Sequence, residues 1–303
     1  MNMAYLDQRL AQLDTAFPQR NVDVGDATIA YRESGKSSGA LESGSLTVVA
    51  LHGIGSGAAS WLDVALNMGG NRFIAWDAPG YGQSKPLPQE RPLATDYAAV
   101  LEAFLAAMHI ERCVLVGHSL GALMAAGYLA GKGSQRVRQA VLLSPARGYG
   151  ADAVDSLRVR SERIQTLENL GIAEMARLRS SRLLSEFATD DMREWVRWNM
   201  ASLNPPGYRQ AIEMLCGDDI ARYAPTSVPL AVHCGAQDTI TPPTACEEVA
   251  RMFGTTLTLI DRAGHASPCE AAPAVARAIL DSFKRNWQTD VKEHAAYGSP
   301  GYF

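Results

Sequence analysis

The chain has 303 residues, 47% of them hydrophobic and 20% charged, with a formal net charge of −4. This length admits one large α/β domain or two ordinary ones, and the apolar content is ample for a buried core. The acidic balance and the lack of Lys/Arg runs exclude a basic nucleic-acid-binding surface, and no apolar run reaches the roughly eighteen residues of a membrane-spanning helix.

The N-terminal stretch and the cysteines bear on where the protein works. Asp7, Arg9 and Asp14 interrupt the N-terminal apolar pattern, which argues against a secretory signal. The five cysteines lack C-x-x-C spacing, and most lie among apolar residues. We therefore expect buried free thiols and a cytoplasmic protein. No metal-binding, Walker or dinucleotide-binding motif occurs, so the sequence predicts no cofactor.

The first predicted elements are a short helix and a pair of strands. Residues 4–16 place leucines at helical spacing, which indicates an amphipathic helix that packs on the body of the protein or on a second subunit. If the helix packs on a second subunit, the protein is a homo-oligomer, and the sequence leaves this possibility open. Residues 22–24 and 28–31 suggest two antiparallel strands around Gly25-Asp26. The Gly/Ser-rich residues 36–45 are expected to form a mobile loop.

Apolar runs then alternate with helical patterns. Continuous apolar runs indicate strands that are covered on both faces, as in a parallel sheet. The alternation predicts an α/β fold with a doubly wound, mostly parallel sheet. The strands are expected at 46–51, 72–76, 113–116, 137–143, 228–234 and 256–260, and the helices at 97–108, 122–130, 244–252 and 271–287.

The rhythm changes after the sixth predicted strand, where helical patterns follow one another without a convincing buried strand. This segment is predicted to be a helical cap inserted into the sheet domain. Its four expected helices cover 152–169, 172–184, 190–201 and 206–216. The expected organisation is an N-terminal helical extension (1–20), the first part of the core (21–146), the cap (147–226), the second part of the core (227–287) and a poorly ordered tail (288–303).

One motif joins the strand at 113–116 to the helix that follows it. Gly117-His118-Ser119-Leu120-Gly121 fits the nucleophile elbow G-x-S-x-G, in which the glycines let neighbouring backbones pass closely. The turn would hold the Ser119 hydroxyl at a helix N-terminus, which favours a developing anion. Because roughly one chain in ten of this length contains the pattern by chance, its interpretation depends on a base and an acid elsewhere in the chain.

Asp238 and His265 supply that acid and base. Ser119, Asp238 and His265 follow one another in the order expected for an elbow serine, each at the carboxyl end of a predicted parallel strand, where ligands bind in such sheets. The imidazole would take the serine proton, and the carboxylate would fix the imidazole tautomer. The backbone N–H groups of Ile54 and Leu120 are the predicted oxyanion hole.

Several other residues have more than one interpretation. Asp152 is an alternative acid, because it lies near the end of the preceding predicted strand, 137–143. His52 is expected to fasten the oxyanion loop rather than transfer protons, and His118 to line the floor of the site, either as a structural or as a substrate-contacting residue. Most cap arginines should form a solvated, charge-balanced face, with one of them a candidate to bind a substrate carboxylate. These arginines include Arg158, Arg160, Arg163, Arg177 and Arg179.

With these motifs in this order, the chain resembles the α/β-hydrolase superfamily over residues 22–287. The landmarks, in order, are His52-Gly53, Asp77-x-x-Gly80-x-Gly82-x-Ser84, the elbow, Gly235-x-x-Asp238 and Gly264-His265. Within the superfamily it is similar to 3-oxoadipate enol-lactonase-like esterases and lactonases, through residues 76–82 and 204–208. The resemblance implies a cofactor-free serine hydrolase that acts on a small carboxylic ester or lactone through an acyl-enzyme.

Two other functions stay open. A carbon–carbon bond hydrolase of ring-fission diketones uses the same triad, but that family commonly has Asn before the serine, where this chain has His118. A non-catalytic ligand-binding protein is also compatible with the fold, although both oxyanion positions and the triad are intact. The serine at the elbow excludes epoxide hydrolases and dehalogenases, whose nucleophile is an aspartate.

Overall fold

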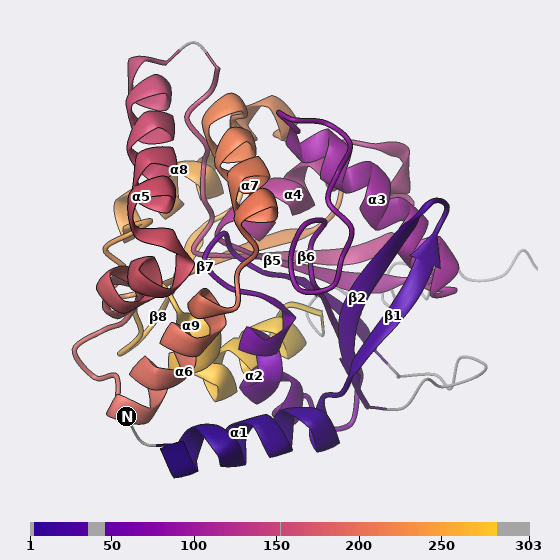
Figure 1. Cartoon of the computed structure of the whole chain (residues 1–303). Coiled ribbons are helices and arrows are strands. Elements are labelled where there is room, and N and C mark those ends of the chain that lie inside the picture. The colour runs from indigo at the N-terminus through magenta and orange to yellow at the C-terminus, as the bar shows by residue number, and fades with distance from the viewer. Residues whose placement is uncertain (1–2, 36–45, 152, 284–303) are drawn as a thin grey trace, which may run out of the picture.

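The computed structural model of the chain describes residues 3–35, 46–151 and 153–283 and is built on one eight-stranded sheet (Figure 1). The strand order is β1-β2-β4-β3-β5-β6-β7-β8. Strands β1 (Gln19–Val24) and β2 (Ala27–Ser34) form an antiparallel hairpin, and β2 also pairs antiparallel with β4. All other neighbours are parallel. The predicted doubly wound, mostly parallel sheet is confirmed.

The remaining elements of the core follow the predicted order. A difference of note is the strand expected at 228–234, which begins at Leu230, since Pro229 has no N–H for the ladder. The strands are β3 (Thr47–Leu51), β4 (Arg72–Trp76), β5 (Cys113–His118), β6 (Val137–Leu143), β7 (Leu230–Gly235) and β8 (Leu257–Ile260). The helices are α1 (Met3–Ala16), α2 (Leu62–Leu66), α3 (Ala94–Ala107), α4 (Leu120–Leu129), α8 (Pro243–Met252) and α9 (Ser267–Glu270), with a further helical stretch over 272–283.

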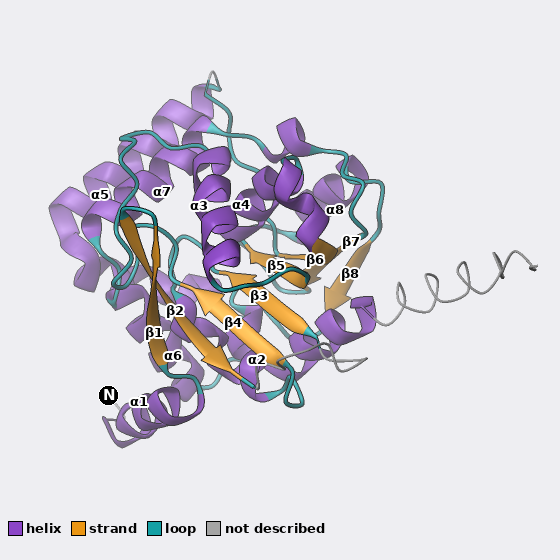
Figure 2. Ribbon diagram, turned by 90° about the vertical axis from the view of Figure 1, so that its right-hand side faces the viewer, coloured by secondary structure: helices purple, strands orange, loops and turns teal. Residues whose placement is uncertain are grey.

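The central strands separate two apolar cores. Alternate residues of β3 point to opposite faces, so Val49 and Leu51 join one core while Val48 and Ala50 join the other. Helices α3, α4 and α8 contribute to the first core, and α1 and α2 to the second, on opposite sides of the sheet (Figure 2). Burial on both faces explains why the strands read as continuous apolar runs.

The helical insertion lies between β6 and β7, after the sixth strand as predicted. It comprises α5 (Val154–Arg179), the short 3₁₀ helix η3 (Ser180–Leu183), α6 (Asp190–Ala201) and α7 (Pro205–Gly217). Helices α5 and α7 pack side by side (Figure 1). Gly171 interrupts α5 with φ 69° and ψ 174°, a conformation open to glycine, and this break is where the sequence predicts the end of one helix and the start of the next.

Helix α1 docks on the body of the protein, one of the two positions that its pattern predicts. The Arg9 guanidinium lies 2.6 Å from the Asp63 carboxylate on α2 and 4.9 Å from the centre of the Trp195 ring on α6. Arg9 therefore joins the sheet domain to the cap. Three predictions fall on residues outside the described ranges: the loop at 36–45, the acid candidate Asp152 and the tail at 288–303.

The five cysteines are free and buried, as the sequence predicts. Among the described residues, no helix combines the length and the apolar character that crossing a membrane requires.

Candidate active site

Ser119 is the single residue between the end of β5 and the start of α4. Its φ of 53° and ψ of −116° belong to a region that residues with a Cβ seldom adopt, at a cost of about 1–3 kcal/mol. The turn is held by its neighbours, because the Ser119 N–H donates to Leu143 O at 2.9 Å and Ser119 O accepts from Ala122 N and Ala146 N. A Cβ at Gly121 would collide with the carbonyl of Leu51, so the glycine allows α4 to start against the end of β3.

The loop after β3 passes beside Ser119, since a Cβ added at Gly53 would lie 3.0 Å from Ser119 Cβ. His52 fixes this loop. Its Nδ1 must donate to the Gly53 carbonyl at 2.9 Å, because a carbonyl only accepts, and its Nε2 accepts from Ala78 N at 3.0 Å. Burial lowers the pKa of His52, which keeps the imidazole neutral. Both ring nitrogens are therefore engaged, and His52 fastens the loop as the sequence predicts.

The two predicted oxyanion donors lie at the wall of the same cavity as Ser119. Ile54 follows the fixed Gly53, and its carbonyl accepts a hydrogen bond from Tyr81 Oη at 3.0 Å. Leu120 is the first residue of α4, and the N–H groups of a first helical turn have no partner within the helix. Both backbone N–H groups are thus candidates to meet a developing anion beside Ser119.

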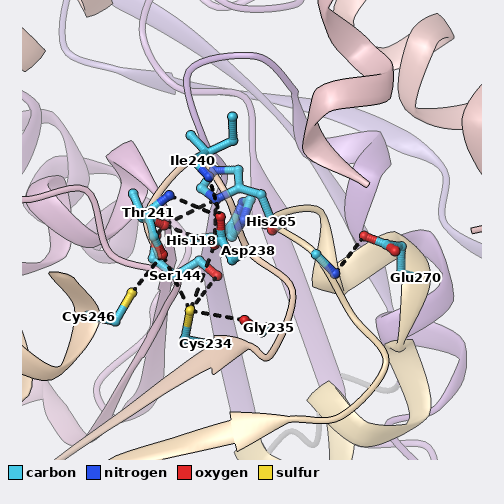
Figure 3. A network of polar contacts seen from close by, with 11 residues as sticks. His118, Ser144, Cys234, Gly235, Asp238, Ile240, Thr241, Cys246, His265 and Glu270 are labelled. Atoms are coloured by element: carbon cyan, nitrogen blue, oxygen red, sulfur yellow. Dashed lines mark hydrogen bonds and ion pairs between the residues drawn. The ribbon is translucent and has the colours of Figure 1, made fainter. Parts of the chain in front are cut away.

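Asp238 and His265 make direct contact (Figure 3). Nδ1 of His265 lies 2.8 Å from Oδ2 of Asp238. Asp238 follows β7 and His265 follows β8, and these strands are parallel neighbours, so their carboxyl ends bring the two side chains together. Because the carboxylate accepts the Nδ1 proton, the neutral imidazole carries its lone pair on Nε2.

The Asp238 carboxylate is held by further donors. Its Oδ1 accepts from the N–H groups of Ile240 at 2.8 Å and Thr241 at 3.0 Å, and its Oδ2 lies 3.0 Å from the Thr241 hydroxyl (Figure 3). Burial acts to raise the pKa of Asp238, but the hydrogen bond and charge of His265 and the donors on Thr241 and Ser144 outweigh it, and the pKa falls to about 2. The carboxylate is ionised at neutral pH.

Thr241 belongs to this network, and sequence reasoning missed it. Its hydroxyl lies 3.0 Å from Ser144 O and 3.2 Å from His265 Nδ1, in addition to Asp238. The only available signal was its position three residues after the acid, which alone does not distinguish a loop threonine from a positioning residue.

His118 supports His265 from the other side. Its Nε2 donates to the carbonyl of His265 at 2.8 Å, and the two rings lie 5.0 Å apart between centroids. Burial, followed by the proximity of His265, lowers the pKa of His118 to about 3. His118 thus has the structural role, since it holds the backbone of His265, and it lines the cavity. Its contact with a substrate stays a prediction.

The cavity has a volume of about 430 Å³ and lies between the sheet domain and the cap. Ser119, His118 and His265 form part of its wall, with Met175, Val196 and Tyr208 contributed by cap helices. This volume suits a small-molecule ligand. Among the described residues, no three metal-ligating side chains gather at one place.

The structure therefore brings Asp238 into contact with His265 and places Ser119, Ile54, Leu120 and His265 around one cavity. A model of the alpha/beta hydrolase family matches residues 48–278, more than half of the chain. The chain belongs to this family. It is an α/β-fold hydrolase, as the sequence predicts.

Curated relatives of this alpha/beta hydrolase include hydrolases that are named for 2-hydroxy-6-oxo dienoates and related compounds. A 2-hydroxy-6-oxo-6-phenylhexa-2,4-dienoate hydrolase from Burkholderia cepacia is 27% identical over 252 residues, which is 77% of this chain and 86% of that protein. Other curated relatives, 31–32% identical and named for similar substrates, align over only 39–45% of their own length.

Solved structures share the fold. An esterase from Thermogutta terrifontis superposes with a TM-score of 0.76 at 23% identity, over 88% of this chain and 98% of that one. The enol-lactonase from Burkholderia xenovorans LB400 superposes with a TM-score of 0.74 at 20% identity, over 88% of this chain and all of the other (100%). At these identities the similarity concerns the fold alone. The substrates of these two enzymes are therefore not assigned to this alpha/beta hydrolase.

Proposed function

We propose that this alpha/beta hydrolase is a cofactor-free serine hydrolase that cleaves a small carboxylic ester or lactone. Ser119 is the nucleophile, His265 the general base and acid, and Asp238 the carboxylate that orients the imidazole. The observation that carries the proposal is the 2.8 Å contact between Asp238 and His265, which leaves the Nε2 lone pair of a histidine free to serve a strained serine in the same cavity.

The first half of the reaction acylates Ser119. Its Oγ attacks the substrate carbonyl carbon while the Oγ proton passes to Nε2 of His265. The carbonyl oxygen becomes an oxyanion, which the N–H groups of Ile54 and Leu120 stabilise. The C–O bond to the leaving group then breaks, and His265 returns the proton to the departing alkoxide. An ester releases an alcohol, whereas the alkoxide of a lactone stays attached to the acyl chain.

The second half releases the acid. A water molecule gives its proton to His265 and attacks the acyl carbon, and the oxyanion forms again in the same place. When the intermediate collapses, the proton returns from His265 to Ser119 Oγ. Each time His265 is an imidazolium, the Asp238 carboxylate, with its pKa of about 2, compensates the charge.

A second candidate function is carbon–carbon bond hydrolysis of a ring-fission product. The observation in its favour is the curated relative from Burkholderia cepacia, which acts on a 2-hydroxy-6-oxo dienoate. The residue before the serine, His118, speaks against it, since Asn is common there in that family. The kcat/KM values for a lactone panel and for a vinylogous diketone would separate the two chemistries.

The direct test is turnover of p-nitrophenyl acetate. The Ser119→Ala variant should lose about 10⁶-fold in kcat, the usual cost of removing such a serine. Ser202→Ala, a serine exposed at the end of α6, is the matched control and should keep full activity. Equal rates in the wild-type protein and Ser119→Ala would remove Ser119 from the mechanism. The cytoplasmic location and the homo-oligomer that the sequence leaves open stay predictions.

A further inference from the structure

The charged residues of the cavity wall all have one sign. Four arginines contribute to it, Arg147, Arg163, Arg179 and Arg182, and among the described lining residues there is no aspartate or glutamate. Three of them come from the segment α5–η3 of the cap. A small substrate that enters this cavity therefore meets these positive charges as well as the apolar and catalytic residues.

The cap arginines differ in their partners. Arg147, which also lines the cavity, pairs with Asp219 and Glu248. Arg158, Arg160, Arg177, Arg193, Arg197, Arg209 and Arg222 each pair with a carboxylate as well. Within the described part of the cap, the arginines without an ion pair are Arg163, Arg179 and Arg182, and all three line the cavity.

This arrangement carries an electrostatic cost in the folded protein. Burial lowers the pKa of Arg179, and the positive charges of Arg163 and Arg182 lower it further. Arg163 is held near the other two by Tyr208, whose Oη accepts from its Nη1 at 3.4 Å. Arg163 and Arg179 are half-buried and Arg182 is exposed, so solvent screens part of this repulsion. No carboxylate of the described cap offsets the three charges, whereas an anionic ligand in the cavity would do so.

We propose that Arg163, Arg179 and Arg182 form a carboxylate-binding subsite, so that the substrate is an ester or lactone with a free carboxylate at its other end. The inference rests on the proposed function, because it takes Ser119 as the place of the reacting carbonyl. Guanidinium groups suit a carboxylate, which they can bind through two parallel hydrogen bonds. The apolar side chains of Met175 and Val196 in the same wall suit the carbon chain between the two ends.

A matched pair of substrates tests the subsite. The p-nitrophenyl monoester of glutaric acid and p-nitrophenyl pentanoate have acyl chains of the same length and differ in the terminal carboxylate. The quantity measured is the ratio of kcat/KM for the anionic ester to that for the neutral one, at constant ionic strength. The wild-type ratio should exceed one, and it should fall about 10-fold or more in Arg163→Gln, Arg179→Gln or Arg182→Gln, the usual effect of a charge-assisted hydrogen bond.

Arg177→Gln is the matched control, because Arg177 lies on the same helix but is exposed and pairs with Glu174. Its ratio should equal that of the wild-type protein. Arg179→Lys keeps the charge and should restore part of the ratio, which distinguishes the loss of the charge from a loss of stability in Arg179→Gln. A ratio that is equal in the wild-type protein and all three glutamine variants overturns the subsite.

Direct binding separates this proposal from the proposed function. Isothermal titration calorimetry with glutarate and Ser119→Ala needs no turnover, and binding should weaken at least 10-fold when Arg179→Gln is added. If neither ester is cleaved but this binding is found, the subsite stands and the serine hydrolase fails. If esters are cleaved but glutarate does not bind, the serine hydrolase stands and the subsite fails. If sodium sulfate bound to the Ser119→Ala protein as tightly as glutarate and displaced it, the site would be an unselective anion site, which would contradict the carboxylate assignment.

Discussion

The imidazole of His265 and the carboxylate of Asp238 meet at 2.8 Å although 27 positions separate them in the chain. Both residues follow neighbouring parallel strands, and each is fixed by a second group: His265 by the His118 ring on its carbonyl, Asp238 by the N–H groups of its own loop. The orientation of the imidazole is therefore set mainly by groups of the sheet domain. The cap contacts the same loop, because the N–H of Ala266 donates to the carbonyl of Leu183 at 2.8 Å.

Replacing Asp238 with Asn should lower kcat by about 10⁴-fold with the fold intact, because an amide no longer enforces the tautomer with its lone pair on Nε2. The measurement is kcat for p-nitrophenyl acetate, with circular dichroism to verify folding. Asp261→Asn, an exposed carboxylate four positions before His265, should have no comparable effect. If Asp152→Asn reproduced the loss and Asp238→Asn did not, the acid would have been assigned to the wrong residue.

Much of the fold follows from local sequence signals. The glycines at 117 and 121 and the apolar run before them place Ser119 at a sharp turn, and the continuous apolar strands imply a sheet that is covered on both faces. The sheet topology then brings the site residues together, since the carboxyl ends of neighbouring parallel strands lie at the same edge of the sheet. This is why the order Ser119, Asp238, His265 is enough to predict that the three residues share one region.

Other features depend on how distant segments pack, and the local sequence does not distinguish them from alternatives. Thr241 acts through three partners on different loops, and the contact of His118 with the His265 carbonyl joins residues 147 positions apart. Similarly, Arg163 and Arg177 look alike in the sequence, but one lines the cavity and the other pairs with Glu174 on the surface. The two residues lie on opposite sides of the break at Gly171, and their similar sequence surroundings do not reveal which half of α5 faces the cavity.

The stability of the protein should fall in mild acid because of His118. The native state keeps this buried imidazole neutral down to a pKa of about 3, whereas the unfolded chain binds a proton near pH 6.5. The stabilisation by His118 is thus complete above about pH 6.5 and decreases as the pH falls toward the folded pKa. At pH 4 the loss should be on the order of 3 kcal/mol.

Urea unfolding at pH 7, 6, 5 and 4 measures this effect when wild-type protein is compared with His118→Asn. The free energy of unfolding should decrease less steeply with acidification in the variant, since contributions from the carboxylates and from His52 are common to both proteins. Parallel pH profiles would mean that His118 takes up its proton in the native state as readily as in the unfolded chain.

Arg9 should contribute to stability by joining α1 to both α2 and the cap helix α6. Its side chain is 11% exposed, and Arg9→Ala removes an ion pair with Asp63 and a contact with the Trp195 ring. We expect a loss of about 1–3 kcal/mol, measured by urea unfolding. Arg158→Ala breaks exposed pairs with Asp155 and Glu162 and should have a much smaller effect, because solvent screens exposed ion pairs. Equal effects would show that α1 does not brace the cap.

The contact between α7 and the loop after β4 should tolerate no side chain at Gly207. A Cβ there would overlap the carbonyl group of Gly80, whose φ of 86° is itself one that favours glycine. Gly207→Ala should therefore destabilise the protein by about 1–3 kcal/mol, since two main chains have to separate. Gly217→Ala, near the other end of α7, is the matched control, because its Cβ would meet the nearest atom at an ordinary 3.6 Å. There the helical preference of alanine should leave stability unchanged or raise it by up to ~1 kcal/mol. Urea unfolding of both variants checks the difference, and a Gly207→Ala protein as stable as Gly217→Ala would show that the cap can shift away from the sheet domain at little cost.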